Sequence, residues 1–146
     1  MVKNIKNNKG FVILFAVTIS AILLSIALGV ANIALKEVKF GTSARDTNDA
    51  FFAADTGIEY ALFHDKPSVN SYPYTLLPGN IQTYSNIIVS GLGSVGASCA
   101  IVSIKKDNTN PLIISTTIIA KGYNIGDALC DSTNSDRIER EIRTIY

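Results

Sequence analysis

The segment GLGSVG, residues 91–96, has the residue types and spacing of a dinucleotide-binding loop, because it matches the pattern GxGxxG. That chemistry needs a following helix whose amide groups face the pyrophosphate, whereas the next residues, ASCAIVSIKK, are typical of a strand. Too little chain follows for a βαβ unit. We therefore interpret residues 91–96 as a loop between two strands.

His64 is the single histidine and the next candidate for catalysis. It stands beside Asp65 and Lys66 where a helix is expected to end, and a cation there offsets the helix dipole. The sequence contains no GxSxG, HExxH or CxxC motif, and no nucleophile, base and orienting group can be placed together. The sequence therefore predicts a protein that is not an enzyme and that has no cofactor.

The acidic and basic side chains are candidate ligands for metal ions and for nucleic acid. Three loop aspartates do not have the spacing of an EF-hand, so no metal site is expected from Asp127, Asp131 and Asp136. A basic patch for DNA is conceivable from Lys105, Lys106, Arg137, Arg140 and Arg143. However, the formal net charge is only +1, which does not favour nucleic-acid binding.

Cys99 and Cys130 are the two cysteines, 31 positions apart. In an oxidising compartment they are available to form a disulfide, which would stabilise the fold by roughly 3–4 kcal/mol in the chain-entropy model. We favour this disulfide over the alternative of two reduced cysteines, one of them packed in the core.

The distribution of apolar residues predicts the helices and strands in which the side chains discussed above lie. The chain has 146 residues, of which 47% are hydrophobic and 17% charged, and this is more apolar than a typical soluble domain. Residues 11–35 contain no charge, and 25 helical residues suffice to cross a hydrocarbon core of about 30 Å. Three lysines precede this segment, Lys3, Lys6 and Lys9, and they predict a cytoplasmic N-terminus. The precursor is then expected to cross the inner membrane once, with the chain beyond residue 35 exported.

Residues 36–66 predict an amphipathic continuation of the same helix, which ends before Pro67. Apolar residues recur at spacings of three, four and seven, which places them on one helical face: Phe40, Ala44, Phe51, Ala54, Ile58, Ala61 and Leu62. In water this stripe needs an apolar partner. We expect Phe51, Ala54 and Ile58 to pack against a sheet.

Residues 67–146 predict that sheet. Three β-prone runs occupy 81–90, 99–106 and 112–121, and the ending DRIEREIRTIY fits a strand or a helix, of which we favour the strand. The predicted fold class is α+β, a long N-terminal helix packed on a small antiparallel sheet. Its predicted parts are 1–10 as leader, 11–35 as membrane helix, 36–66 as amphipathic half-helix and 67–146 as globular domain.

These features resemble type IV pilins. The sequence NKG followed by FVILF is similar to a prepilin junction, and AFFAADTGIEYAL, residues 50–62, resembles the helix of minor pilins and type II secretion pseudopilins. The resemblance implies that a prepilin peptidase cuts after Gly10 and methylates Phe11. It also implies that the N-terminal helix binds other pilin subunits within a pilus assembly machinery, and that the mature protein leaves the membrane for a surface pilus.

One position departs from the family pattern. Most pilins have glutamate as the fifth mature residue, and here that residue is Phe15. This favours a minor or initiating subunit over a filament-filling one. The alternatives are a type II secretion pseudopilin, a membrane-anchored surface-binding protein that does not polymerise, and a secreted protein cut after a small residue such as Ala31.

Overall fold

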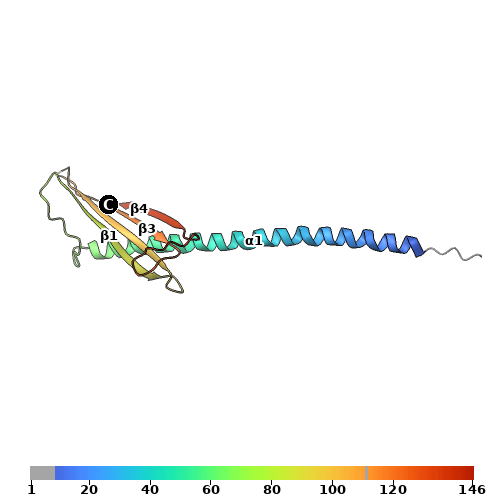
Figure 1. Cartoon of the computed structure of the whole chain (residues 1–146). Coiled ribbons are helices and arrows are strands. Elements are labelled where there is room, and N and C mark those ends of the chain that lie inside the picture. The colour runs from blue at the N-terminus through green and yellow to red at the C-terminus, as the bar shows by residue number, and fades with distance from the viewer. Residues whose placement is uncertain (1–8, 111) are drawn as a thin grey trace, which may run out of the picture. The chain divides into compact units, whose positions relative to one another are not determined.

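The computed structural model describes residues 9–110 and 112–146, which form one long helix followed by four strands (Figure 1). The helix α1 spans Lys9–Asp65, and the strands are β1 Ile81–Leu92, β2 Ser98–Asp107, β3 Ser115–Tyr123 and β4 Glu139–Ile145. The helix packs on a small antiparallel sheet, so the predicted α+β fold class is confirmed.

Asp65 is the last residue of α1, because Pro67 disfavours a helical conformation of Lys66, the residue that precedes it. No proline interrupts the helix. The chain divides into two compact units, one ending at Thr42 and the other spanning Ser43–Tyr146, and each contains part of α1.

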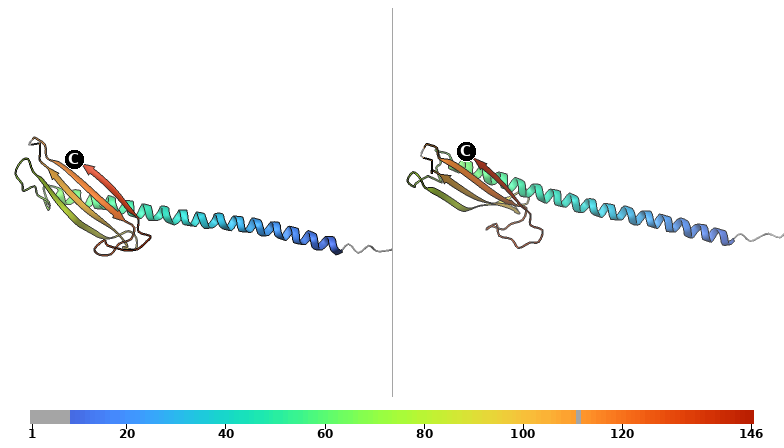
Figure 2. Two further views of the ribbon diagram at one scale, coloured as in Figure 1. Left: turned by 45° about the horizontal axis from the view of Figure 1, so that its top comes forward. Right: turned by 90° about the horizontal axis from the view of Figure 1, so that it is seen from above.

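The sheet has the simplest antiparallel order, β1-β2-β3-β4, so each strand pairs with its neighbours in sequence (Figure 2). The β2–β3 register is regular, with Ile104 opposite Ile118. Edge strand β1 has two register shifts against β2, one at Asn86, where φ is 58°, and one at Gly91, where φ is 74°. The other edge, β4, alternates acidic, basic and apolar residues in the sequence EREIRTI.

Two predicted strands can be compared directly with the structure. The C-terminal segment forms β4 and pairs with β3, as favoured from the sequence. Strand β3 begins at Ser115 rather than at residue 112, because polar side chains fold the preceding residues into turns. Asp107 accepts a hydrogen bond from the Thr109 amide at 3.0 Å, and Asn110 accepts one from the Leu112 amide at 3.1 Å.

The core of the second unit lies between α1 and one face of the sheet. The sheet contributes fully buried aliphatic residues from its two central strands: Ala100, Val102, Ile104, Ile118 and Ala120. The helix contributes mainly small residues: Ala50, Ala53, Ala54, Ile58 and Ala61. Their spacing of three and four residues places them on one face of the helix.

Glycines allow the helix and sheet backbones to come very close. A Cβ atom on Gly122 of β3 would lie 2.2 Å from the Ala50 carbonyl oxygen of α1. On the helix, a Cβ on Gly57 would lie 3.0 Å from the Ala100 Cβ atom. Helix and sheet therefore meet almost backbone to backbone along this line.

One of the three predicted packing residues is not buried, because helix and sheet approach so closely. Ala54 and Ile58 are buried at the sheet, but Phe51 is 47% exposed, so its predicted burial is wrong. An interface lined by alanine and glycine leaves no space for an aromatic ring. Phe51 instead lies beside the interface, with its ring edge-on to the ring of Phe52 at a centroid distance of 5.9 Å.

Candidate functional site

The apolar part of α1 is the first candidate site. Within the described residues, α1 alone is long and apolar enough to cross a membrane, and its apolar stretch lies near the N-terminus. Two of the polar side chains in this stretch bond to the helix itself, since Thr18 donates to the Phe15 carbonyl and Ser25 to the Ala21 carbonyl, both at 2.9 Å. These hydroxyl groups therefore need no water, as hydrocarbon surroundings require.

The predicted processing junction lies between Gly10 and Phe11. Residues 1–8 of the predicted leader lie outside the described residues, and Gly10 belongs to the first turn of α1. The Phe11 side chain is 72% exposed, and its ring stacks on that of Phe15 with a centroid distance of 6.4 Å. An aromatic pair thus occupies the helix start where the pilin pattern has a carboxylate, and cleavage after Gly10 stays a prediction.

The predicted disulfide between Cys99 and Cys130 is present. It joins the start of β2 to the loop between β3 and β4, and both cysteines are 1% exposed. Gly126 of this loop donates a backbone hydrogen bond to Ala97 at 2.7 Å, and a Cβ on Gly126 would lie 2.1 Å from the Cys99 sulfur. The loop is therefore clamped on the sheet by both covalent and backbone contacts.

A polar network also holds the β3–β4 loop in place. The Arg137 guanidinium lies 3.7 Å from the centre of the Tyr123 ring and donates to the Cys130 carbonyl at 2.6 Å. Glu139 accepts hydrogen bonds from the Tyr123 hydroxyl at 2.7 Å and from Lys121 at 2.9 Å. These two donors, Tyr123 foremost, hold the pKa of the Glu139 carboxyl below its ordinary value.

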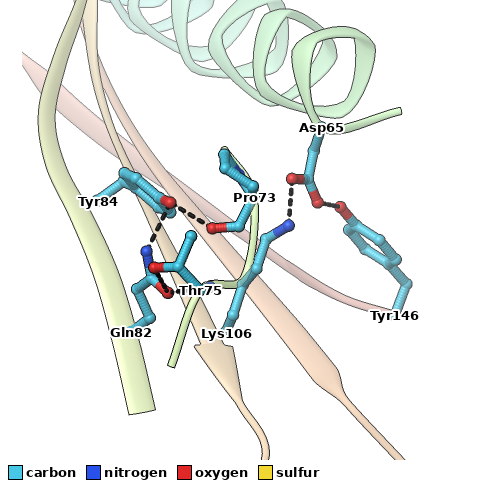
Figure 3. A network of polar contacts seen from close by, with 7 residues as sticks. All are labelled: Asp65, Pro73, Thr75, Gln82, Tyr84, Lys106 and Tyr146. Carbon is cyan, nitrogen blue, oxygen red and sulfur yellow. Dashed lines mark hydrogen bonds and ion pairs between the residues drawn. The ribbon is translucent and has the colours of Figure 1, made fainter. Parts of the chain in front are cut away.

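A second network lies where α1 ends (Figure 3). The carboxylate of Asp65 forms an ion pair with Lys106 of β2 at 2.5 Å and accepts a hydrogen bond from the Tyr146 hydroxyl at 2.6 Å. The side chains of Asp65 and Lys106 are only 4% and 10% exposed. Burial, and then the hydrogen bond to Asp65, raises the pKa of Tyr146.

A carboxylate at a helix C-terminus opposes the helix dipole, so Asp65 needs its two partners. Lys106 and Tyr146 come from β2 and from the residue after β4, and together they fix the end of α1 to two separate parts of the sheet. We assign this network a structural role.

The connector between α1 and β1 is fastened next to this network (Figure 3). Tyr84 of β1 donates a hydrogen bond to the Pro73 carbonyl, and Gln82 donates to the Tyr84 hydroxyl at 2.6 Å. The Gln82 side chain also accepts from the Thr75 amide at 2.8 Å. The connector therefore follows the β1 edge of the sheet.

The residues considered for nucleotide chemistry and catalysis occupy different parts of the second unit. His64 is half-buried near the end of α1, with Nδ1 2.8 Å from the Tyr60 carbonyl oxygen. Residues 91–96 join β1 to β2 through glycines of positive φ, and a strand rather than a helix follows. The amide cradle of a dinucleotide site is thus not formed by this segment.

The ionic candidates are not brought together into a ligand set. Asp127 accepts backbone hydrogen bonds from Asp131 and Leu129, both at 2.9 Å, which lower its pKa. No group of three or more histidine, cysteine, aspartate or glutamate side chains within residues 9–110 and 112–146 is placed to hold a metal ion.

The basic side chains are similarly divided between the two faces of the sheet. Lys106 is buried on the face toward α1 with Asp65, whereas Lys105 is on the opposite face beside Asp107 at 3.5 Å. Arg140 is 3.5 Å from Thr47 of α1, on the helix side. These side chains do not form one basic patch.

Sequence reasoning missed the Asp65 network and the Gly122 contact. A carboxylate at the predicted helix end was a usable signal, since it is unfavourable without a cationic partner. Nothing in the sequence identified Lys106 or Tyr146 as those partners, because the strand register was unknown. Comparison of the chain with protein-family models, with curated proteins and with solved structures gives no match.

Proposed function

We propose that this protein is a minor pilin, a structural subunit of a type IV pilus that is cut after Gly10 and assembled through residues 11–35. The observation that carries the proposal is the pairing of two properties in α1. Residues 11–35 are uncharged and predominantly apolar, and the last part of the helix packs on a disulfide-closed sheet. Such a helix suits lipid before assembly and other apolar helices afterwards.

Three further features support a minor subunit outside the cytoplasm. The buried disulfide is typical of a protein that folds in an oxidising compartment. The lysines before residue 11 favour export of the sheet unit. Phe15 removes the carboxylate that a filament-filling pilin uses to pair with a neighbouring N-terminus, so an initiating or tip position suits this chain better.

The decisive experiment is mass spectrometry of the mature N-terminus in filaments sheared from the cell surface. We expect a chain that begins at methylated Phe11, and we expect Gly10→Leu to block both processing and recovery in the sheared fraction. Gly41→Leu is the matched control, because nothing lies within 4 Å of a Cβ at that helical glycine in the subunit.

The other outcomes identify the alternatives. An intact leader on cell-bound protein would support a membrane-anchored protein that does not polymerise. A soluble chain cut after Ala31 would support ordinary secretion, and a Phe11 terminus absent from sheared filaments would support a pseudopilin. Intact chains beginning at Met1 in extracellular filaments would refute the proposed processing.

A further inference from the structure

The Ser43–Tyr146 unit has an exposed aliphatic surface at the end where α1 terminates. We call this surface the aliphatic tip; it consists of Leu76 and Leu77 in the connector before β1, and Leu112, Ile113 and Ile114 in the β2–β3 loop. Leu77 and Leu112 are 77% and 88% exposed. Large aliphatic side chains on two loops are thus presented to the surroundings rather than to the core.

The two loops are held together at their bases. Gly79 donates a backbone hydrogen bond to Asn108 at 2.7 Å, and Asn108 donates one to Asn80 at 3.1 Å. Figures 1 and 2 show the connector and the β2–β3 loop side by side beyond the end of α1. The aliphatic tip is therefore one surface built from two segments.

Polar backbone groups within the tip bond to the protein itself. The Leu77 carbonyl accepts from the Tyr74 hydroxyl at 3.0 Å and from the Asn80 side chain at 3.1 Å. On the other loop, Asn110 accepts from the amides of Leu112 and Ile113, both at 3.1 Å. These groups would lose few hydrogen bonds with water on entering an apolar medium.

The tip also lacks charge. Residues 67–80 and 108–114 contain no Asp, Glu, Lys, Arg or His. A protein partner is usually oriented by charged groups, and these two segments supply none; their exposed polar side chains are uncharged hydroxyls and amides such as Ser68, Asn70 and Thr109. Tyr74 lies in the same connector, half-buried with its hydroxyl bonded to the Leu77 and Asn80 carbonyls, and tyrosine is a side chain typical of the boundary between hydrocarbon and water.

We propose that the aliphatic tip inserts into the surface of a lipid bilayer. The leucine and isoleucine side chains enter the acyl region, and Tyr74 remains at the headgroup level. Because the tip is uncharged, binding needs no anionic lipid and changes little with salt. The tip lies at the end of the unit where α1 terminates (Figure 1), and this inference does not depend on the proposed pilus function.

The test uses the full chain in lipid nanodiscs, so that residues 11–35 are already embedded. Nanodiscs are mixed with separate phosphatidylcholine vesicles and floated through a density gradient, with empty nanodiscs as the blank. We expect protein-loaded nanodiscs to float with the vesicles equally well at low and high salt. No flotation above the blank would overturn the proposal.

Two variants locate the binding surface. Leu77→Asp with Leu112→Asp should lower vesicle binding roughly tenfold or more, because two exposed aliphatic side chains that enter the acyl region in this proposal become charged. Val95→Asp with Leu129→Asp is the matched control, since these aliphatic residues are 82% and 68% exposed but lie in loops at the other end of the sheet.

A thermal melt confirms that each variant is folded, and Leu77→Ser with Leu112→Ser replaces the tip variant should it not fold. Equal losses in the tip and control variants would refute a specific lipid surface. The unsubstituted chain and the tip variant are also compared for dimer formation. If the tip variant retained vesicle binding but lost a dimer that the unsubstituted chain forms, the tip would be assigned to contact with a second copy of the chain instead.

Discussion

Lys106→Met should destabilise the Ser43–Tyr146 unit by about 3–5 kcal/mol, the usual cost of removing one partner from a buried ion pair. Methionine fills a similar volume, so the change mainly removes the ammonium group. The Asp65 carboxylate, 4% exposed, would then have only the Tyr146 hydroxyl at 2.6 Å as a partner. A loss of this size is a large fraction of the roughly 5–15 kcal/mol that stabilises a typical domain.

Urea denaturation of the full chain in detergent micelles, followed by near-ultraviolet circular dichroism, measures this loss. Lys105→Met is the matched control, because this neighbouring lysine is on the opposite face with a 48% exposed side chain and should change stability little. Adding Asp65→Asn to Lys106→Met should recover most of the loss, since no buried charge then remains. A Lys106→Met midpoint equal to that of the unsubstituted chain would refute the reasoning.

Three more perturbations test the second unit. Gly122→Ala should cost roughly 1–3 kcal/mol or more in thermal or urea melts, because its Cβ would overlap the backbone of α1. Replacing Cys99 and Cys130 together by serine should lower stability by roughly 3–4 kcal/mol, measured by the same melts without reductant. Glu139→Gln should flatten the loss of stability that occurs as the pH falls below about 4.5. The folded-state pKa of Glu139 is below its ordinary 4.5, so its contribution is present above pH 4.5 and disappears as the pH falls through the folded pKa.

Each of these three has a control that isolates its cause. Gly41→Ala places a methyl group where nothing lies within 4 Å and should not destabilise the protein. Reductant added to the unsubstituted chain should reproduce the effect of the serine pair. Glu141→Gln removes a carboxylate that is 4.0 Å from Lys121, and a pH profile as flat as that of Glu139→Gln would contradict the role given to the Tyr123 hydrogen bond.

The order and type of the elements were predictable because their signals are local. An uncharged run, the absence of proline before Pro67 and β-branched segments each depend on neighbouring residues in the sequence. The disulfide was also predictable, because only two cysteines are present. The start of β3 was misplaced by three residues, since the hydrogen bonds of Asp107 and Asn110 outweighed the β-propensity of residues 112–114.

The packing residues were less predictable because size, rather than hydrophobicity, decides them. Phe51 is the more hydrophobic residue, but Ala50 and Ala53 occupy the interface. The need for small residues comes from Gly122, which is 72 positions away from Ala50 and contacts it only once the sheet has formed. The partners of Asp65 depend on the same long-range register, so neither could be inferred from local spacing.

The two edges of the sheet differ in a way that bears on aggregation. Strand β4 presents alternating charged side chains, which discourage pairing with a strand of another molecule. Strand β1 is twelve residues long and uncharged, but its two register shifts break the regular row of backbone donors and acceptors that a new strand would need. The irregular conformations at Asn86 and Gly91 therefore protect the β1 edge against pairing with other molecules. A regular β1 strand would instead be a template for intermolecular sheets.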